Sequence, residues 1–343
     1  MQVNGDAAQE GRSMRRTLAG VVALLFALGG MIGLAVAADD PKYPTKPIQL
    51  IVTFAPGGTT DLVARAIAET AKKYLGNIVV LNRAGGSSTI GGNEMVDAPK
   101  DGYTLGMING SVLWQPIYEQ TKYDYAVALD PIADLLEGQY AFWVRGSSPW
   151  KSVDELVAYA KAHPGEIKYS HSGYGGPMHV IGEIFGMKAG IKLVQVPFKS
   201  QSESVPAALG GHVQAVVEQP TGLEGYLASG DLRPLAVSGN ERSPALPNVK
   251  TFKELGYAVG IYSFQGIAAP KGIPAGAKAK LVEAFKKIAA DEEFAKKMAG
   301  LSQTIRYKGP EETQKRWQDF VAENRKMVKE LGIYEKMRQT GGK

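Results

Sequence analysis

The chain has 343 residues, of which 44% are hydrophobic, with a net charge of +5 and no cysteine. This length suffices for two domains with separate cores, whereas the lack of cysteine excludes disulfides, thiol chemistry and a lipid-anchored lipoprotein. Lysines in the C-terminal third alternate with acidic residues at helical spacing, which is typical of solvated helix faces. No nucleic-acid-binding motif accompanies them, so we expect no nucleic-acid partner.

The first 37 residues are predicted to be a signal peptide. A basic pair, Arg15-Arg16, precedes an almost wholly apolar run at 18–36, and residues 35–37 (Ala-Val-Ala) fit an A-x-A cleavage signature. The run is also long enough for a marginal membrane span, but its small-residue end favours cleavage. We expect export to the periplasm and cleavage after Ala37, by either the general or the twin-arginine route.

A glycine loop follows the first predicted strand, residues 48–54, and precedes a helix predicted at about 60–75. The unpaired N–H groups and the positive dipole end of such a helix start suit an anion, and glycine allows close backbone approach. An ordinary tight strand–helix connection is the alternative. Asp61 either favours the helix dipole or orients ligand or water. The candidate ligand-binding residues here are Ala55, Pro56, Gly57, Gly58, Thr59 and Asp61.

Strand and helix signals continue to alternate, with strands predicted at 78–81 and 103–108 and helices at 89–96 and near 113–118. This alternation favours an α/β fold with mainly parallel sheets. Ligands of such sheets bind outside the carboxyl ends of the strands. The loops that leave these strands therefore add four candidates, Ser87, Ser88, Asn109 and Ser111.

The middle of the chain repeats this strand–glycine loop–helix pattern. Helices are predicted at 153–162, 178–189 and 205–209, and strands at 167–170, 193–196, 213–217 and 233–238. Glu218, at a strand end, either accepts a hydrogen bond from a ligand amine or hydroxyl or is a solvated loop acid. The candidates from these loops are Ser172, Gly173, Tyr174, Gly175, Lys199, Ser200, Glu218 and Gln219.

Two extended stretches, at 137–145 and 262–269, are predicted to cross between two domains. After the second crossing come helices at 277–289 and 292–299, and a last helix from Pro310 that we expect to lie on the first domain. The first domain is thus predicted to be discontinuous, residues 38–140 plus 266–343, and the second to span 141–265. Two crossings make a natural hinge, with a ligand cleft between the lobes.

No catalytic or metal motif is recognised. The chain has no G-x-S-x-G elbow, its glycine-rich segment 85–92 lacks a Gly-Lys-Ser/Thr ending, and its four histidines form no H-x-x-x-H pair. We expect no enzyme, no metal site and no cofactor. The alternative is an α/β enzyme that uses Asp61, His171 or Glu218 as acid or base, because sequence spacing cannot place such groups within hydrogen-bond reach.

Six short motifs follow one another along about residues 43–335. They are 43–48 (Y-P-T-K-P-I) leading into 54–61 (F-A-P-G-G-T-T-D), 82–86 with 90–91, 101–105 (D-G-Y-T-L), 196–199 (V-P-F-K), 209–213 (L-G-G-H-V) and 242–247 (R-S-P-A-L-P). Each is weak alone, but their order is specific. The chain resembles the tripartite tricarboxylate transporter receptor family, the Bug-type extracytoplasmic solute receptors.

This resemblance implies a type II-like periplasmic binding protein with two α/β lobes. It implies that backbone N–H groups of the glycine loops and bridging waters hold a small organic carboxylate, which a two-subunit membrane permease then receives. We expect a monomer; a sensory or scavenging receptor without its own permease is the alternative. Several residues depart from the family pattern, so the aliphatic or aromatic nature of the ligand stays open: Thr59, Ser87, Ser88, His171, Pro177, Met178, Ser200, Glu218 and Gln219.

Overall fold

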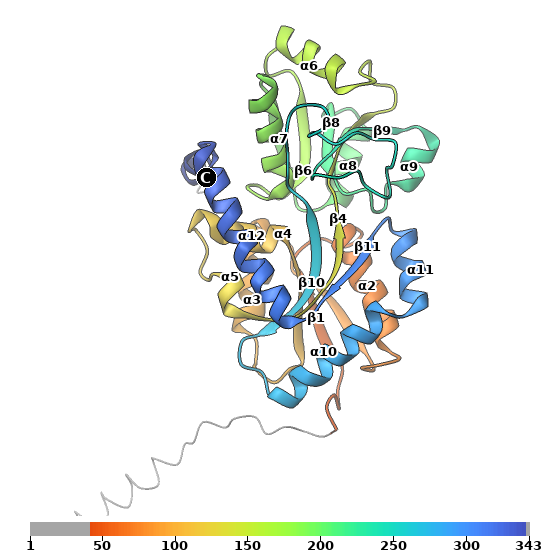
Figure 1. The fold of residues 1–343 in the computed structure, drawn as a ribbon, viewed down its shortest axis with the longest axis vertical. Coiled ribbons are helices and arrows are strands. Elements are labelled where there is room, and N and C mark those ends of the chain that lie inside the picture. The colour runs from red at the N-terminus through yellow and green to blue at the C-terminus, as the bar shows by residue number, and fades with distance from the viewer. Residues whose placement is uncertain (1–41, 341–343) are drawn as a thin grey trace, which may run out of the picture. The chain divides into compact units, whose positions relative to one another are not determined.

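The computed structural model describes residues 42–340, and the predicted signal peptide lies outside them. These described residues pack as one unit. Two β-sheets flanked by helices make up this unit (Figure 1), which confirms the predicted α/β fold. Within residues 42–340, none of the helices combines the length and the apolar character that crossing a bilayer requires.

The first sheet has six strands in the order β11-β4-β10-β3-β1-β2. Its strands are β1 (Ile48–Val52), β2 (Ile78–Asn82), β3 (Thr104–Asn109), β4 (Leu129–Gly138), β10 (Ser263–Pro270) and β11 (Thr304–Lys308). β1 pairs in parallel with β2 and β3, as the alternation of strands and helices predicts. In contrast, β10 is antiparallel to β3 and β4, and β11 is antiparallel to β4.

The second sheet has five strands in the order β7-β6-β8-β5-β9. They are β5 (Ala141–Arg145), β6 (Lys168–Ser172), β7 (Val194–Phe198), β8 (Ala215–Glu218) and β9 (Leu232–Val237). β6 is parallel to β7 and β8, whereas β5 is antiparallel to β8 and β9. The sheets are therefore mixed, and the expectation of mainly parallel sheets is wrong. In the first sheet, β4 carries the chain out toward the second sheet and β10 carries it back, so these two neighbours run in opposite directions.

Helices cover both sheets. We call the six-stranded sheet with α2 to α5 and α10 to α12 the first lobe, and the five-stranded sheet with α6 to α9 the second lobe. The helices are α2 (Thr59–Ala71), α3 (Thr89–Asp97), α4 (Gly110–Trp114), α5 (Tyr125–Ala128), α6 (Val153–Ala162), α7 (Pro177–Ala189), α8 (Gln201–Leu209), α9 (Glu224–Ser229), α10 (Ala275–Ala289), α11 (Glu292–Gly300), α12 (Pro310–Glu330) and α13 (Ile333–Thr340), with 3-10 turns at Gly86–Ser88 and Gln115–Tyr118.

The chain passes between the lobes at the end of β4 and again before β10, and Figure 1 shows these two paired strands side by side. Arg316 of α12 contacts both crossings. Its guanidinium lies 2.7 Å from the carboxylate of Glu137 on β4, and 4.9 Å from the ring centre of Phe264 on β10. The predicted domain limits fall near this double crossing and stay a prediction.

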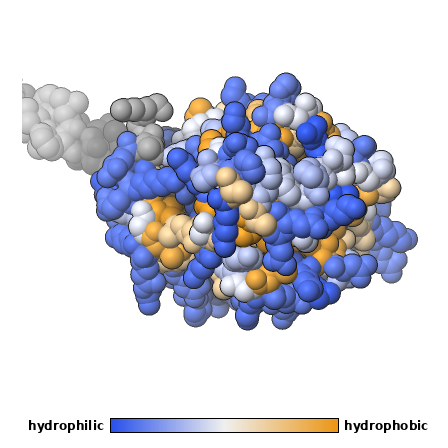
Figure 2. Space-filling model, turned by 90° about the horizontal axis from the view of Figure 1, so that it is seen from above, coloured by the Kyte–Doolittle hydropathy of each residue, from blue (hydrophilic) through white to orange (hydrophobic). Residues whose placement is uncertain are grey.

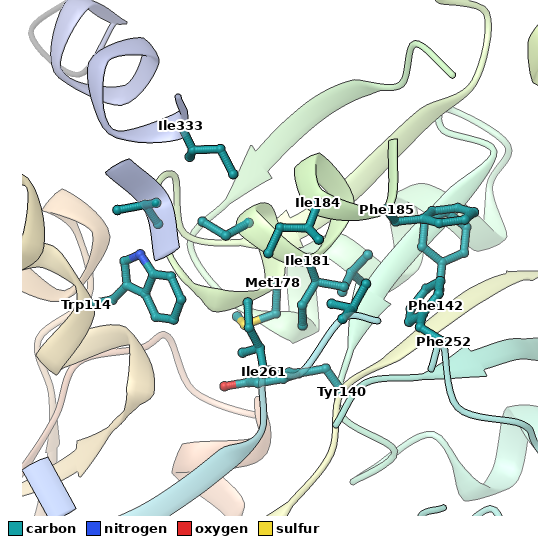
Figure 3. Packing of buried hydrophobic residues seen from close by; sticks show 14 of the residues in the cluster. Trp114, Tyr140, Phe142, Met178, Ile181, Ile184, Phe185, Phe252, Ile261 and Ile333 are labelled. Atoms are coloured by element: carbon teal, nitrogen blue, oxygen red, sulfur yellow. The ribbon is translucent and has the colours of Figure 1, made fainter. Parts of the chain in front are cut away.

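Buried apolar side chains continue from one lobe to the other (Figure 3). Trp114 of α4 and Ile333 of α13 belong to the same cluster as Met178 and Ile181 of α7. The long helix α12 packs on β4, as expected for the last helix. The short α13 that follows also reaches the second lobe, where Lys336 pairs with Glu183 of α7. The helix α13 therefore contacts both α12 and the second lobe.

The face of the molecule seen in Figure 2 is mostly hydrophilic, with apolar patches between the hydrophilic residues. Large hydrophobic side chains that are exposed include Ile90, Val127, Met187 and Tyr262. They come from separate elements of the fold. Scattered exposure of this kind is ordinary for a folded surface.

Candidate functional site

The first glycine loop connects β1 to α2, which begins at Thr59. Gly57 has φ +82°, in the region that favours glycine, whereas Gly58 is extended and precedes the helix as its cap residue. The N–H of Gly57 donates to the carboxylate of Asp61 at 2.9 Å. The first N–H of the helix itself, that of Thr59, donates across the cleft to the side chain of Gln201 at 3.1 Å.

Asp61 is buried and holds this loop in place. Its two carboxylate oxygens accept hydrogen bonds from Arg65 at 2.9 and 3.0 Å and from Asn82 at 2.9 Å. Burial alone raises the pKa of Asp61, but the hydrogen bonds from Arg65, Gly57 and Asn82 outweigh burial and hold this pKa below its ordinary value. The charge of Asp61 is thus compensated inside the first lobe.

A small cavity lies between the lobes at the end of this loop. Its volume is about 20 Å³, which is room for about one water molecule. Eight predicted residues line it, Gly58, Thr59, Asn109, Ser111, Ser172, Ser200, Glu218 and Gln219, together with five that the sequence analysis did not select, Phe54, Thr60, Tyr140, Met178 and Gln201. The lobes are therefore closed on each other around a polar pocket.

Asn109 forms the first-lobe wall of this cavity beside the glycine loop. Its side-chain oxygen caps α4 by accepting hydrogen bonds from the N–H groups of Ser111 at 3.0 Å and Val112 at 3.3 Å. Its amide nitrogen donates to the hydroxyl of Thr60 at 3.3 Å. Because β1 and β3 are parallel neighbours, the loops after them meet at the same sheet edge, as predicted.

Glu218 forms the opposite wall and is not the solvated acid that one interpretation expects. Its carboxyl group accepts hydrogen bonds from the hydroxyls of Ser172 and Ser204, the latter at 2.8 Å. Burial raises the pKa of Glu218 from 4.5 to about 7, despite these hydrogen bonds. A carboxyl group that can be neutral near neutral pH therefore lines the cavity together with Gly58 and Asn109 of the first lobe.

Gln201 is the main residue that sequence reasoning missed. The predicted helix starts at Val205, whereas α8 starts at Gln201, with Ser200 as its cap residue. The S-x-x-E pattern of Ser200 and Glu203 was the available sequence signal for this helix start. In the structure the carboxylate of Glu203 accepts the N–H of Lys199, one residue before the cap, at 3.1 Å.

A second cavity of about 330 Å³ continues along the cleft. Five other predicted residues line it: Ser87, Ser88, Gly173, Tyr174 and Lys199. Gly175 lines an adjoining surface pocket together with Ser87 and Tyr174. Ala55, Pro56, Gly57 and Asp61 line neither of the two cleft cavities, although the carbonyl of Pro56 accepts a hydrogen bond from Ser202 across the cleft at 2.9 Å.

The three acid–base candidates of the enzyme alternative lie in separate networks. Asp61 pairs with Arg65, Glu218 with two serines, and His171 with the side chain of Gln195 at 3.0 Å. Burial, and after it the neighbouring His179, lowers the pKa of His171 to about 3. Among residues 42–340, no group of three or more His, Cys, Asp or Glu side chains is placed to hold a metal ion.

Comparisons with known proteins agree with this architecture. The family model described as tripartite tricarboxylate transporter family receptor matches residues 63–333. Protein BugT of Bordetella pertussis is 34% identical over 265 residues, covering 76% of this chain and 80% of that protein.

Two solved structures are similar over most of their length. The periplasmic binding protein BugD shares 29% identity with a TM-score of 0.81, covering 84% of this chain and 99% of the other. An R. palustris protein with adipate shares 26% identity with a TM-score of 0.79, covering 84% and 98%. With a family model that matches most of the chain and relatives aligned over both lobes, the chain belongs to the tripartite tricarboxylate transporter receptor family.

Proposed function

We propose that this protein is a periplasmic solute receptor that captures a small organic carboxylate between its lobes. The observation that carries the proposal is the N–H of Thr59, which opens α2 and faces across the cleft to an oxygen acceptor of the second lobe. A helix start that already holds an oxygen atom can hold a carboxylate oxygen in its place. Backbone donors bind the ligand without a buried cationic side chain.

The second lobe supplies the other contacts of the proposed ligand. Ser172, Ser200 and Gln219 line the same cavity and offer hydroxyl and amide groups. The similar R. palustris protein is known with adipate, which is a small dicarboxylate, and this supports the choice of ligand class. Residues of the neighbouring cavity, among them Ser88 and Lys199, are proposed to contact the distal end of a longer ligand.

Mass spectrometry of the purified protein under native conditions tests the ligand class. We expect a small organic carboxylate to leave the protein upon denaturation, and isothermal titration to return the same compound to one site per chain. The ligand should leave chemically unchanged after long incubation. Turnover of the compound would support the enzyme alternative, and a cationic ligand would contradict the proposed class.

We further propose that the chain is exported with cleavage after Ala37 and delivers its ligand as a monomer to a two-subunit permease. N-terminal sequencing of protein from the periplasm should begin at Ala38. Deletion of the gene should abolish uptake of the labelled carboxylate, and deletion of the permease subunits should have the same effect. Uptake that survives loss of the permease would favour a scavenging or sensory receptor instead.

A further inference from the structure

We propose that Gln201 is a built-in latch, whose side-chain amide occupies the carboxylate position of the cleft and holds the empty receptor closed. Gln201 opens α8 in the second lobe, 142 residues along the chain from Thr59. Its amide oxygen accepts the N–H of Thr59 at 3.1 Å and also the hydroxyl of the same residue. The first lobe thus presents both of these donors to one oxygen of the second lobe.

The hydrogen-bond partners of the amide fix its orientation. Its nitrogen donates to the backbone carbonyls of Gln219 at 3.1 Å and Thr221 at 2.8 Å. These carbonyls only accept hydrogen bonds, so the NH₂ group must face them and the oxygen must face Thr59. Gln201 therefore presents an acceptor to the helix start, as a carboxylate does.

The segment that anchors the amide is itself held from the first lobe. The side-chain nitrogen of Gln303, between α11 and β11, donates to the hydroxyl of Thr221 at 2.5 Å and to the side chain of Gln219 at 3.3 Å. All three residues are buried. The latch is thus part of a polar network that spans both lobes, and opening the cleft has to break it.

Little space is left for a ligand beside the latch. Gln201 is 7% exposed, and the cavity that it lines has a volume of about 20 Å³. A carboxylate that reaches the N–H of Thr59 must therefore displace the amide of Gln201. This consequence rests on the proposed function, whereas the closure of the empty protein does not.

Competition of this kind lowers the apparent affinity of the ligand. The empty protein divides its time between latched and open forms, and the ligand binds only after the latch has opened. Since the latch consists of a few hydrogen bonds, removing it should raise the affinity roughly tenfold. The latch also keeps weak anions from occupying the helix start.

The test uses two variants and one control. Gln201→Met keeps the size of the side chain and removes its hydrogen bonds, whereas Gln201→Ala also frees volume. Ser202→Ala is the matched control, because it removes a hydrogen bond between the lobes, to the carbonyl of Pro56, away from the helix start.

Small-angle scattering and amide hydrogen exchange of the ligand-free proteins test whether Gln201 holds the lobes together. We expect a larger radius of gyration and faster exchange of the Thr59 amide in both Gln201 variants, and neither change in Ser202→Ala. An effect in Gln201→Ala alone would overturn the proposal, since it would assign the change to free volume. Unchanged values in both variants would overturn it as well.

Titration with adipate then tests the competition. If adipate binds, Gln201→Met should bind it roughly tenfold more tightly than the unchanged protein, and equal affinity would contradict the competition. Failure of adipate and of every carboxylate to bind any of the proteins would count against the proposed function. The scattering and exchange results would still decide whether Gln201 closes the empty protein.

Discussion

The two glycine loops before α2 and α7 have nearly the same construction and different consequences. In each, a glycine with positive φ, Gly57 at +82° or Gly175 at +71°, precedes an extended glycine that caps the helix. In each, the N–H of the positive-φ glycine donates to the side chain four residues later, Asp61 at 2.9 Å or His179 at 3.0 Å. The sequence repeat between the lobes is therefore also a repeat of hydrogen bonds.

The loops differ at the first residue of the helix and in the charge of the acceptor. The first helix begins with Thr59, whose N–H faces the cleft, whereas the second begins with Pro177, which has no N–H. Asp61 is ionised and paired with Arg65, whereas His179 is buried and stacked on His171. The same turn thus provides an anion-binding donor in one lobe and an uncharged, acid-sensitive support in the other.

The largest expected effect concerns the acid sensitivity of the second loop. His171 has a pKa of about 3 when folded, against an ordinary 6.5. The unfolded chain therefore binds more protons below pH 6.5, so stability is fully present above that pH and falls by about 5 kcal/mol as the pH drops to 3. Urea unfolding between pH 7 and 4 should show that the free energy of unfolding of wild type falls more steeply with decreasing pH than that of His171→Gln.

The first loop provides the control for this experiment. The pKa of Asp61 is held below its ordinary 3.8, so the stability that Asp61 contributes is present above 3.8 and is lost only below it. Asp61→Asn should therefore lower stability by a constant amount between pH 7 and 5. A pH-independent difference for His171→Gln would show that the histidine pair does not distinguish the loops.

A smaller and opposite dependence is expected at Glu218, which faces the first loop. Its folded pKa of about 7 lies above its ordinary 4.5, so the folded state binds more protons. The corresponding stability is present below pH 4.5, and about 3 kcal/mol of it is lost as the pH rises through 7. The stability of wild type relative to Glu218→Gln should fall between pH 4.5 and 8, and a flat difference would place this carboxyl in a solvated environment.

The positive-φ glycines should be costly to replace in both loops. Alanine at Gly57 or Gly175 should reduce the free energy of unfolding by about 1–2 kcal/mol, because L-residues are strained in the left-handed region. The added methyl at Gly175 also meets the ring of Tyr118 at 3.1 Å. Gly58→Ala is the control, since Gly58 has φ −84° and its nearest neighbours are at 3.6 Å. Equal losses in urea unfolding for all three variants would contradict the strain argument.

The sequence predicts the loops better than the contacts between them. The apolar runs and the glycines between them predict the strand before Thr59 and the helix after it, because these are local features of the sequence. β11 was missed because its residues 304–308 are half exposed at a sheet edge and lack a clear apolar pattern. Antiparallel β10 could not be distinguished from a parallel strand, since pairing direction depends on residues far away in the sequence.

The candidate site shows the same limit. The sequence selects Gly58, Asn109 and Glu218 because each follows a strand, and the structure brings them to one cavity. It cannot indicate that Asp61 turns toward Arg65 or that Gln201 reaches Thr59, because these side-chain directions are set by tertiary packing. The contact with Gln201 joins two lobes, and no local pattern encodes it.

The central claim is that the backbone N–H of Thr59 binds the ligand carboxylate, and one substitution tests it most directly. Thr59→Pro removes this N–H and makes α2 begin with proline, as α7 begins with Pro177. Proline is well tolerated at the first helical position. In the Gln201→Met background, we expect titration with the co-purified carboxylate to show roughly a ten- to hundredfold loss of affinity relative to Thr59→Ala, which keeps the N–H. Equal affinity of the two folded proteins would contradict the account.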